Sequence, residues 1–268
     1  MNTALLTRQE GAVCILTNNN PAARNAITAG LYAALPAALR AAQADPTVGA
    51  IVLTGTGDFF CAGGDLKQLA TRRELALPQR HERIACLHDL IRAIRACEKP
   101  VIAAVEGGAA GAGLSLAMAC DLLVVARDAS FSMAYVKVGL TPDGGATAFL
   151  AEFVSRQILT ELCLTGAPMT GERLHAMGAV NRLTDKGAAL AEALVLAARI
   201  AKGPARATAR IKALCGHAYG VDLDAQMTLE AELMAVSQGD DEAVEGITAF
   251  FAKRAPDFVA LRGRSTQP

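Results

Sequence analysis

The chain has 268 residues, of which 52% are hydrophobic and 19% charged, and its 26 basic residues balance its 26 acidic residues. This length can bury one or two cores, while the zero net charge argues against a strong electrostatic grip on nucleic acid or on an anionic membrane. The uncharged stretch Gly107–Cys120 is too short and too glycine-rich to span a bilayer. We therefore expect neither a nucleic-acid partner nor a membrane partner.

Strands and helices are predicted to alternate over the first 130 residues. Strands are expected at Ala4–Arg8, Val13–Thr17, Ala50–Thr54, Val101–Val105 and Asp121–Ala126, and helices at Ala29–Ala44, Leu66–Thr71, Arg80–Cys97 and Ala112–Ala119. The first strands form a hairpin, Thr28 caps the first long helix, and the charged segment Arg72–Gln79 is expected to be a mobile loop. The repeated strand, turn and helix order favours an α/β fold with parallel strands.

From about Gly144 the pattern becomes helical, with one further strand at Val180–Leu183. Helices are predicted at Ala146–Phe153, Arg156–Thr165, Gly171–Met177, Ala188–Ala201, Ala205–His217, Leu223–Gln238 and Asp240–Lys253. The last two carry apolar stripes with little sequence left to cover them, so they either close the core or form an oligomer interface.

The cysteines and histidines indicate neither disulfides nor a metal site. The seven cysteines are odd in number and scattered without a CxxC pair, which is typical of reduced thiols. The four histidines are far apart, and none has ligand spacing to a second His or Cys. The N-terminus shows no basic patch followed by an apolar core, so we expect no secretory signal and a cytoplasmic protein. The histidine spacing predicts no metal site.

Two turns rich in small residues carry the strongest functional signal. Phe60–Leu66 follows the third predicted strand, Glu106–Gly113 follows the fourth, and each precedes a helix. Small residues leave backbone amides uncovered, so both turns can direct an N–H at the same ligand oxygen. Two such donors form an oxyanion hole, which predicts chemistry at a carbonyl group.

Other glycine-rich and nucleophile motifs are absent from the sequence. Neither turn has GxGxxG spacing, and the chain contains no GxxxxGK[ST] loop and no GxSxG elbow. One carboxylate remains of interest, Asp143, in the turn Thr141–Gly145 before a helix. Asp143 can be an ordinary turn or capping residue, or a base facing the substrate.

Five segments in order resemble the enoyl-CoA hydratase/isomerase (crotonase) superfamily. They are the RNAI segment Arg24–Ile27, the FCAGGDL turn Phe60–Leu66, the KPVIAAVEG strand Lys99–Gly107, the helix segment Gly111–Asp121 and the terminal Phe250–Phe258. The resemblance covers nearly all of the chain. It implies an α/β fold with a crotonase-like spiral of ββα turns, and an acyl-CoA thioester as substrate.

The resemblance also assigns regions and residues. It implies an acyl-CoA-binding and catalytic core at 1–200 and a C-terminal helical trimerisation region at 201–268, which builds a homotrimer or a dimer of trimers. Gly64 and Ala112 supply the oxyanion amides. The CoA lies along Arg24 and along the stretch Ala62, Gly63, Gly64, Asp65 and Leu66. Phe250 and Lys253 reach the CoA of a neighbouring subunit, although Lys253 can also be a solvated helix-end charge. Coenzyme A enters as part of the substrate, so no separate cofactor is expected.

Departures from the family pattern bear on the reaction. Hydratases of the family use two glutamates, and those positions hold Ser115 and Tyr135 here. Adding water needs one group to activate it and one to protonate the α-carbon. Asp143 instead falls where isomerases of the superfamily carry their single carboxylate, and a double-bond shift needs one base. We therefore expect an enoyl-CoA isomerase of fatty-acid or aromatic metabolism, with Ser115 and Tyr135 shaping or polarising the pocket.

Three alternatives stay open at this point. Enoyl-CoA hydratase is the main one, because some members of the superfamily hydrate with atypical residues. An aryl-CoA dehalogenase would use Asp143 as nucleophile and His88 as base, but the tryptophan that those enzymes carry at position 135 is missing. A non-catalytic acyl-CoA-binding subunit is also compatible with a single carboxylate.

Overall fold

A computed structural model describes residues 3–263 and centres on a six-stranded sheet. The strands are β1 (Leu5–Glu10), β2 (Val13–Asn18), β3 (Ala50–Gly55), β4 (Val101–Val105), β6 (Leu122–Ala126) and β9 (Arg182–Thr184). Their order is β1-β2-β3-β4-β6-β9; β1 is antiparallel to β2, and all other pairs are parallel. The predicted hairpin and the predicted parallel strands are confirmed.

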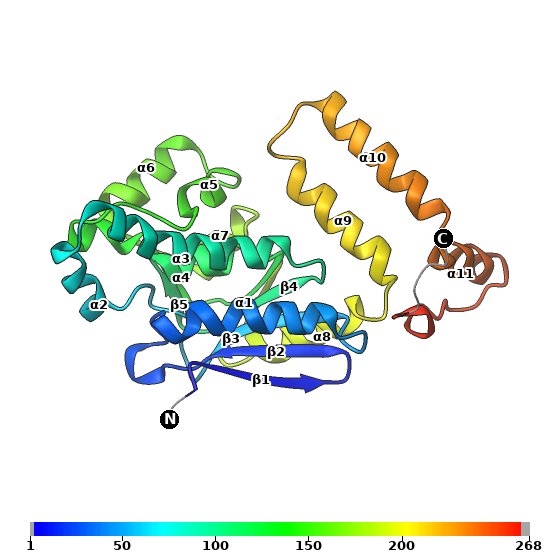
Figure 1. Ribbon diagram of the computed structural model, residues 1–268, viewed down its shortest axis with the longest axis horizontal. Helices are drawn as coiled ribbons and strands as arrows, with labels where there is room; N and C mark the ends of the chain where they lie inside the picture. Colours follow the sequence, from blue (N-terminus) through cyan, green and yellow to red (C-terminus); the bar gives the residue numbers. More distant parts are fainter. Residues whose placement is uncertain (1–2, 264–268) are drawn as a thin grey trace.

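Helices cover both faces of this sheet (Figure 1). On one face α1 (Ala29–Ala44) and α3 (Leu77–Ala96) bury leucines and isoleucines spaced three and four residues apart. On the other face α8 (Ala189–Ile200) buries a stripe of alanines that lets the helix lie close to the strands. Strand β4 between them is buried along its whole length, as its apolar sequence predicts.

A second, three-stranded sheet was not expected from the sequence. It consists of β5 (Gly108–Ala110), β7 (Ser130–Ser132) and β8 (Pro168–Thr170). Strand β5 is made of glycine and alanine, which have low strand propensity, and it exists because it pairs in parallel with β7. The pairing fixes the second glycine turn just before α4 (Ala112–Met118).

The predicted mobile loop at Arg72–Gln79 is wrong. Helix α2 (Leu66–Thr71) continues into a 3-10 turn, η2 (Arg72–Glu74), and α3 begins at Leu77. Pro78 lies in the first turn of α3, where its missing N–H needs no intrahelical partner. The Gln79 side chain also accepts a hydrogen bond from the Ala76 amide at 3.1 Å. Most of the segment is therefore helical.

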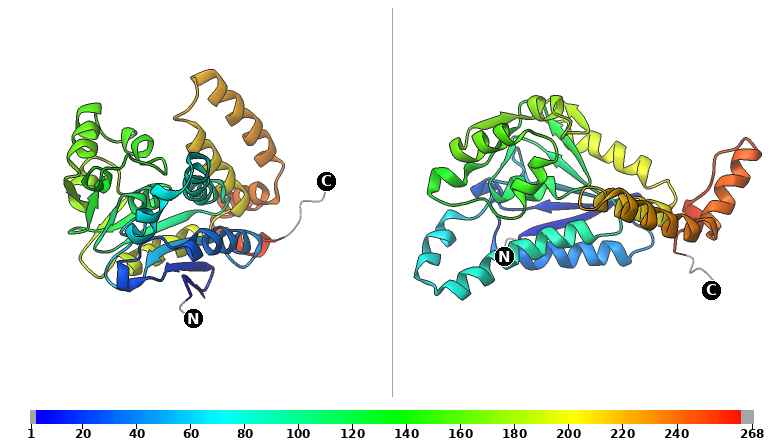
Figure 2. Two further views of the ribbon diagram at one scale, coloured as in Figure 1. Left: turned by 60° about the vertical axis from the view of Figure 1, so that its left-hand side comes forward. Right: turned by 90° about the horizontal axis from the view of Figure 1, so that it is seen from above.

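The remaining helices agree with the sequence prediction to within a few residues. They are α5 (Ala146–Ala151), α6 (Arg156–Thr165), α7 (Gly171–Ala176), α9 (Ala205–His217), α10 (Leu223–Gln238) and α11 (Asp241–Phe251), with further 3-10 turns η1 (Pro21–Ala23), η3 (Ala134–Val138) and η4 (Val259–Leu261). Figure 2 shows α9 and α10 side by side next to the α/β body, with α11 beyond them. Residues 264–268 of the predicted trimerisation region lie outside the described residues. Within 3–263, no helix is long and apolar enough to cross a membrane.

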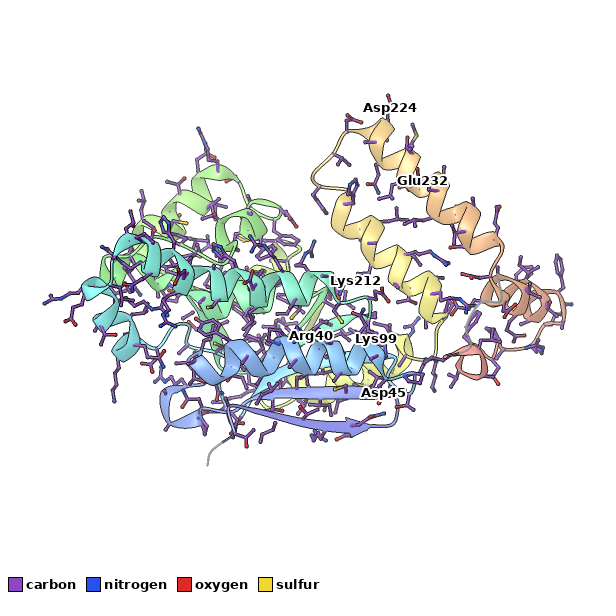
Figure 3. All side chains as sticks on the ribbon, viewed as in Figure 1. Arg40, Asp45, Lys99, Lys212, Asp224 and Glu232 are labelled. Carbon is purple, nitrogen blue, oxygen red and sulfur yellow. The ribbon has the colours of Figure 1, made fainter. Side chains whose placement is uncertain are left out.

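A partly buried ion pair attaches α9 to the α/β body. Lys212 Nζ lies 2.8 Å from Asp121 Oδ2 and donates to the carbonyl oxygen of Lys99 at 3.2 Å. Figure 3 labels Lys212 and Lys99. Asp121 also accepts the Val101 amide at 2.7 Å. Burial raises the pKa of the Asp121 carboxyl, and the Lys212 ammonium offsets part of that effect. This contact sets where the C-terminal helices leave the core.

Candidate active site

The first glycine turn is held by a buried asparagine. Asn25 is fully buried, and its Nδ2 donates to the carbonyl oxygens of Phe59 at 2.5 Å and Thr56 at 2.9 Å. Arg24 and Asn25 both adopt left-handed backbone conformations, with φ of 47° and 55°. Such strain persists only where surrounding contacts impose it, and the Arg24 carbonyl accepts the Ala62 amide at 2.9 Å. The RNAI segment thus fixes the start of the turn.

Backbone hydrogen bonds join the two glycine turns to each other. The Cys61 amide donates to the Gly108 carbonyl at 3.3 Å, and the Ala110 amide donates to the Cys61 carbonyl at 3.0 Å. A Cβ atom on Gly113 would lie 2.2 Å from the Cys61 carbonyl oxygen, and one on Gly63 would lie 2.5 Å from the Ala110 oxygen. Only glycine permits these approaches, so these two glycines are needed for packing.

The approach brings the two predicted donor segments together. A Cβ atom built on Gly63 would lie 3.3 Å from the Ala112 nitrogen, so the Gly63–Gly64 backbone passes directly beside the start of α4. Ala112 is the first residue of α4, where an amide has no intrahelical acceptor. Among residues 3–263, neither the Gly64 amide nor the Ala112 amide donates to a backbone acceptor. Both N–H groups are available to a ligand.

Asp143 lies in a small hydrogen-bonded cluster with the two residues at the hydratase positions. The Tyr135 hydroxyl donates to Asp143 Oδ1 at 2.9 Å, and Ser115 Oγ donates to the Asp143 carbonyl at 3.0 Å. Ser115 is fully buried, Tyr135 is 9% exposed, and Asp143 is half-buried. A Cβ atom on Gly144 would lie 2.9 Å from Ser115 Cβ, so the glycine lets the turn pack against α4. The cluster fixes the position of the carboxylate.

The phenol of Tyr135 remains a proton donor. Burial raises its pKa well above the usual tyrosine range, and the negative charge of Asp143 raises it further. The ring also lies close to Gly111, because a Cβ atom there would be 3.7 Å from Tyr135 Cζ. Since Gly111 precedes Ala112, the phenol links the carboxylate to the start of α4.

Other ionisable groups near the turns have structural partners. The Glu106 carboxylate accepts the Gly187 and Ala189 amides at the start of α8, at 3.0 and 2.7 Å. Asp65 caps α2 by accepting the Lys67 amide at 2.9 Å. Burial raises the pKa of the Cys61 thiol to about 12, so this cysteine is not a thiolate nucleophile at neutral pH. Asp143 is thus the carboxylate in the Ser115–Tyr135 cluster.

The predicted CoA-binding residues fall into two groups. Arg24, Ala62, Asp65 and Leu66 lie along the first turn; the Arg24 guanidinium stacks over the Phe59 ring at 5.6 Å, and Leu66 is largely exposed. Phe250 belongs to α11 and Lys253 follows it, and Figures 1 and 2 show α11 far from α2 and α4. A single chain therefore does not bring Phe250 and Lys253 to the Asp143 cluster.

Of the further residues beside the cluster, Leu87 lies in the segment Arg80–Leu90, which together with Arg72–Gln79 is expected from the sequence to line the acyl pocket. Leu87 of α3 contacts the Asp143 turn, since a Cβ atom on Gly144 would lie 3.1 Å from its Cδ2. Leu69 of α2 lies equally close to the Cβ position of Gly64. Tyr32 of α1 is near enough to Asp143 for the carboxylate charge to act on its phenol. No pattern in the sequence indicated Leu69 or Tyr32.

A known protein family matches nearly the whole chain. Residues 8–260 match the family described as enoyl-CoA hydratase/isomerase. The chain belongs to this family. It is therefore an acyl-CoA enzyme of the hydratase/isomerase type, as the five sequence segments indicated.

Relatives of this hydratase/isomerase chain carry both kinds of name. It is 34% identical to 2,3-dehydroadipyl-CoA hydratase of Escherichia coli (strain K12), over 96% of this chain and 99% of the relative. It is 33% identical to 1,2-epoxyphenylacetyl-CoA isomerase of the same organism, over 95% and 97%. Because a hydratase and an isomerase are both among the relatives, the choice between the two reactions rests on the site residues.

A solved structure confirms the fold class. An enoyl-CoA hydratase from Polaromonas sp. JS666 superposes with a TM-score of 0.91 at 42% identity, covering 94% of this chain and 98% of that one. The α/β crotonase-like architecture with its C-terminal helical region is therefore the fold of this chain.

We predict that Tyr135→Phe lowers kcat by about 10-fold, the value of one hydrogen bond to a charged group, because it removes the donor that positions the Asp143 carboxylate. KM should change little, since the ring and its packing remain. Steady-state kinetics with a 3-enoyl-CoA measures both constants. Tyr219→Phe, at a largely exposed phenol, is the matched control. An unchanged kcat would show that the phenol does not position the carboxylate.

Proposed function

We propose that this protein is an enoyl-CoA isomerase that shifts a carbon–carbon double bond within an acyl-CoA thioester. One observation carries the proposal: a single carboxylate, Asp143, is held by Tyr135 beside the glycine turns whose Gly64 and Ala112 amides are free. The site thus combines one acid/base group with two donors suited to a developing oxyanion. A double-bond shift needs that combination and no second carboxylate.

The proposed reaction has two proton transfers. The Asp143 carboxylate removes a proton from the α-carbon of a 3-enoyl-CoA, and the electron pair moves onto the thioester oxygen as an enolate. The Gly64 and Ala112 amides donate hydrogen bonds to that oxygen. Asp143 then returns the proton to the γ-carbon, which leaves a 2-enoyl-CoA of unchanged composition. Tyr135 keeps the carboxylate in position during both transfers.

Hydration is the second candidate, and the hydratase names among the relatives favour it. It requires a base for water and an acid for the α-carbon. Here the hydroxyls of Ser115 and Tyr135 replace the family's two glutamates, and both donate toward Asp143. Neither Ser115 nor Tyr135 supplies a second carboxylate that could share the base and acid roles of hydration with Asp143. This supports isomerisation as the main activity.

We propose that the CoA portion lies along the first glycine turn. Arg24 is exposed at its start, and Ala62, Asp65 and Leu66 follow it along the same edge of the site. The guanidinium can meet phosphate oxygens, whereas Leu66 offers apolar surface to the pantetheine arm. Coenzyme A enters only as part of the substrate in this proposal, without a further cofactor.

We propose a homo-oligomer, a trimer or a dimer of trimers, assembled through the C-terminal helices. Apolar side chains stand exposed on α10 and α11, including Met234, Ile247, Phe250 at 79% and Phe251 at 78%. An exposed apolar surface of this kind marks an interface. Assembly would also offer Phe250 and Lys253 to a neighbouring site. Sedimentation velocity of the purified chain should give a trimer or hexamer, and a monomer would contradict the proposal.

The cysteines support a cytoplasmic location for the proposed enzyme. All seven are free, and four of them are buried. Reduced thiols persist in the cytosol, whereas oxidising compartments favour disulfides. Fractionation of source cells followed by immunodetection would test this location.

We predict that Asp143→Asn lowers isomerase kcat by about 100- to 10,000-fold, the usual contribution of a general acid/base group. The amide keeps the size of the carboxyl group but cannot take the proton. Conversion of a 3-enoyl-CoA to its 2-enoyl isomer gives the readout. Asp128→Asn, at an exposed position, should retain full activity. Full activity in the Asp143→Asn enzyme would sink the proposed mechanism.

Ala112→Pro tests the second oxyanion donor. Proline is well tolerated at the first position of a helix, but it removes the Ala112 N–H and places ring atoms where the thioester oxygen would lie. We expect a loss of about 100- to 1,000-fold in kcat, as for other oxyanion donors. Arg156→Pro, at the same position of the exposed helix α6, is the matched control. Equal activities in both variants would argue against an Ala112 donor.

A further inference from the structure

A cleft of roughly 320 Å³ lies between the start of α1, the end of α2 and the first turns of α3. Tyr32 of α1, Arg72 of η2, and Arg83 and Cys86 of α3 lie in its wall. The segment that the sequence suggested was a loop forms part of this wall. The wall is thus built mainly from helical residues of a single chain.

The cleft adjoins the Asp143 cluster through the helices that form it. Leu69 of α2 lies beside Gly64, and Leu87 of α3 packs against Gly144 next to Asp143. Cys86 of the cleft is the neighbour of Leu87 in the chain. Burial raises the pKa of the Tyr32 phenol, and the negative charge of Asp143 adds to this effect. The two helices that contact Gly64 and the Asp143 turn thus also line the cleft.

The cleft carries positive charge without a protein carboxylate. Its wall contains two arginines and neither Asp nor Glu. Within residues 3–263, neither Arg72 nor Arg83 belongs to an ion pair. Arg72 is half-buried and lies close enough to Tyr32 for its positive charge to act on the phenol. A half-buried guanidinium that lacks an anionic partner is suited to receive one from a ligand.

We propose that this cleft binds a carboxylate at the far end of the acyl group, so that the preferred substrates are CoA thioesters of unsaturated dicarboxylic acids. The inference rests on the proposed function, because it takes the acyl-CoA site as given. Arg72 and Arg83 would hold the terminal carboxylate through charge-assisted hydrogen bonds, and Tyr32 would fix Arg72. A neutral acyl chain of equal length would leave both guanidinium groups without an anion.

Calorimetric binding of two saturated thioesters tests the proposal without turnover. Hexanoyl-CoA and adipyl-CoA have the same chain length and differ in the terminal carboxylate. We expect adipyl-CoA to bind about 10-fold more tightly to the native protein, the value of a charge-assisted hydrogen bond. Arg72→Gln and Arg83→Gln should each remove most of this preference and leave hexanoyl-CoA affinity unchanged. Arg73→Gln, at an exposed neighbour outside the cleft wall, should keep the preference.

The outcomes separate this inference from the function on which it rests. Equal affinity of the native protein for both esters would overturn the carboxylate site and leave the acyl-CoA site intact. Weaker binding of both esters by the arginine variants would mean that the guanidinium groups hold CoA phosphates, which also overturns it. No binding of either ester would contradict the proposed function itself. Arg83 is exposed, so its variant tests the site even if Arg72→Gln disturbs folding.

Discussion

The close approach of two glycine turns is the constraint on which the rest of the site depends. Cys61 exchanges backbone hydrogen bonds with Gly108 and Ala110, and Gly63 and Gly113 leave no room for a side chain between the turns. The parallel strands β3 and β4 deliver these turns to one edge of the sheet, and β5 holds the second by pairing with β7. The Gly64 and Ala112 amides, which have no backbone acceptor among residues 3–263, are thereby brought together.

The chemistry available at these amides depends on the carboxylate nearby. Helix α4 begins with Ala112 and carries Ser115 one turn later, and the Asp143 turn packs on Ser115 through Gly144. Tyr135 completes the cluster and, as burial raises its pKa, acts as a donor. With hydroxyl groups in place of two family glutamates, the proposed mechanism assigns proton transfer to Asp143 alone, which suits a 1,3 shift within one substrate.

Much of this arrangement could be predicted from the sequence, because apolar periodicity and glycine turns report local structure directly. The strand Val101–Val105, the start of α4 at Ala112 and the helical C-terminus all agree with the structure. Strand β5 could not be predicted, since its Gly-Ala sequence forms a strand only through long-range pairing. The helix start at Leu77 was not predicted, because the charged residues near it and Pro78 are typical of a loop. The cluster of Tyr135 with Asp143 and the cleft near Tyr32 depend on tertiary packing, which no local pattern encodes.

The most direct test of a single-carboxylate isomerase is mass-resolved product analysis of the purified protein. The native chain would be incubated separately with a 3-enoyl-CoA and a 2-enoyl-CoA of equal chain length. A single-carboxylate isomerase should give a new product of unchanged mass from the 3-enoyl-CoA, and little product heavier by one water from either substrate. Rapid formation of the heavier product from the 2-enoyl-CoA, without isomerisation, would contradict it and would assign water activation to the Ser115, Tyr135 and Asp143 cluster.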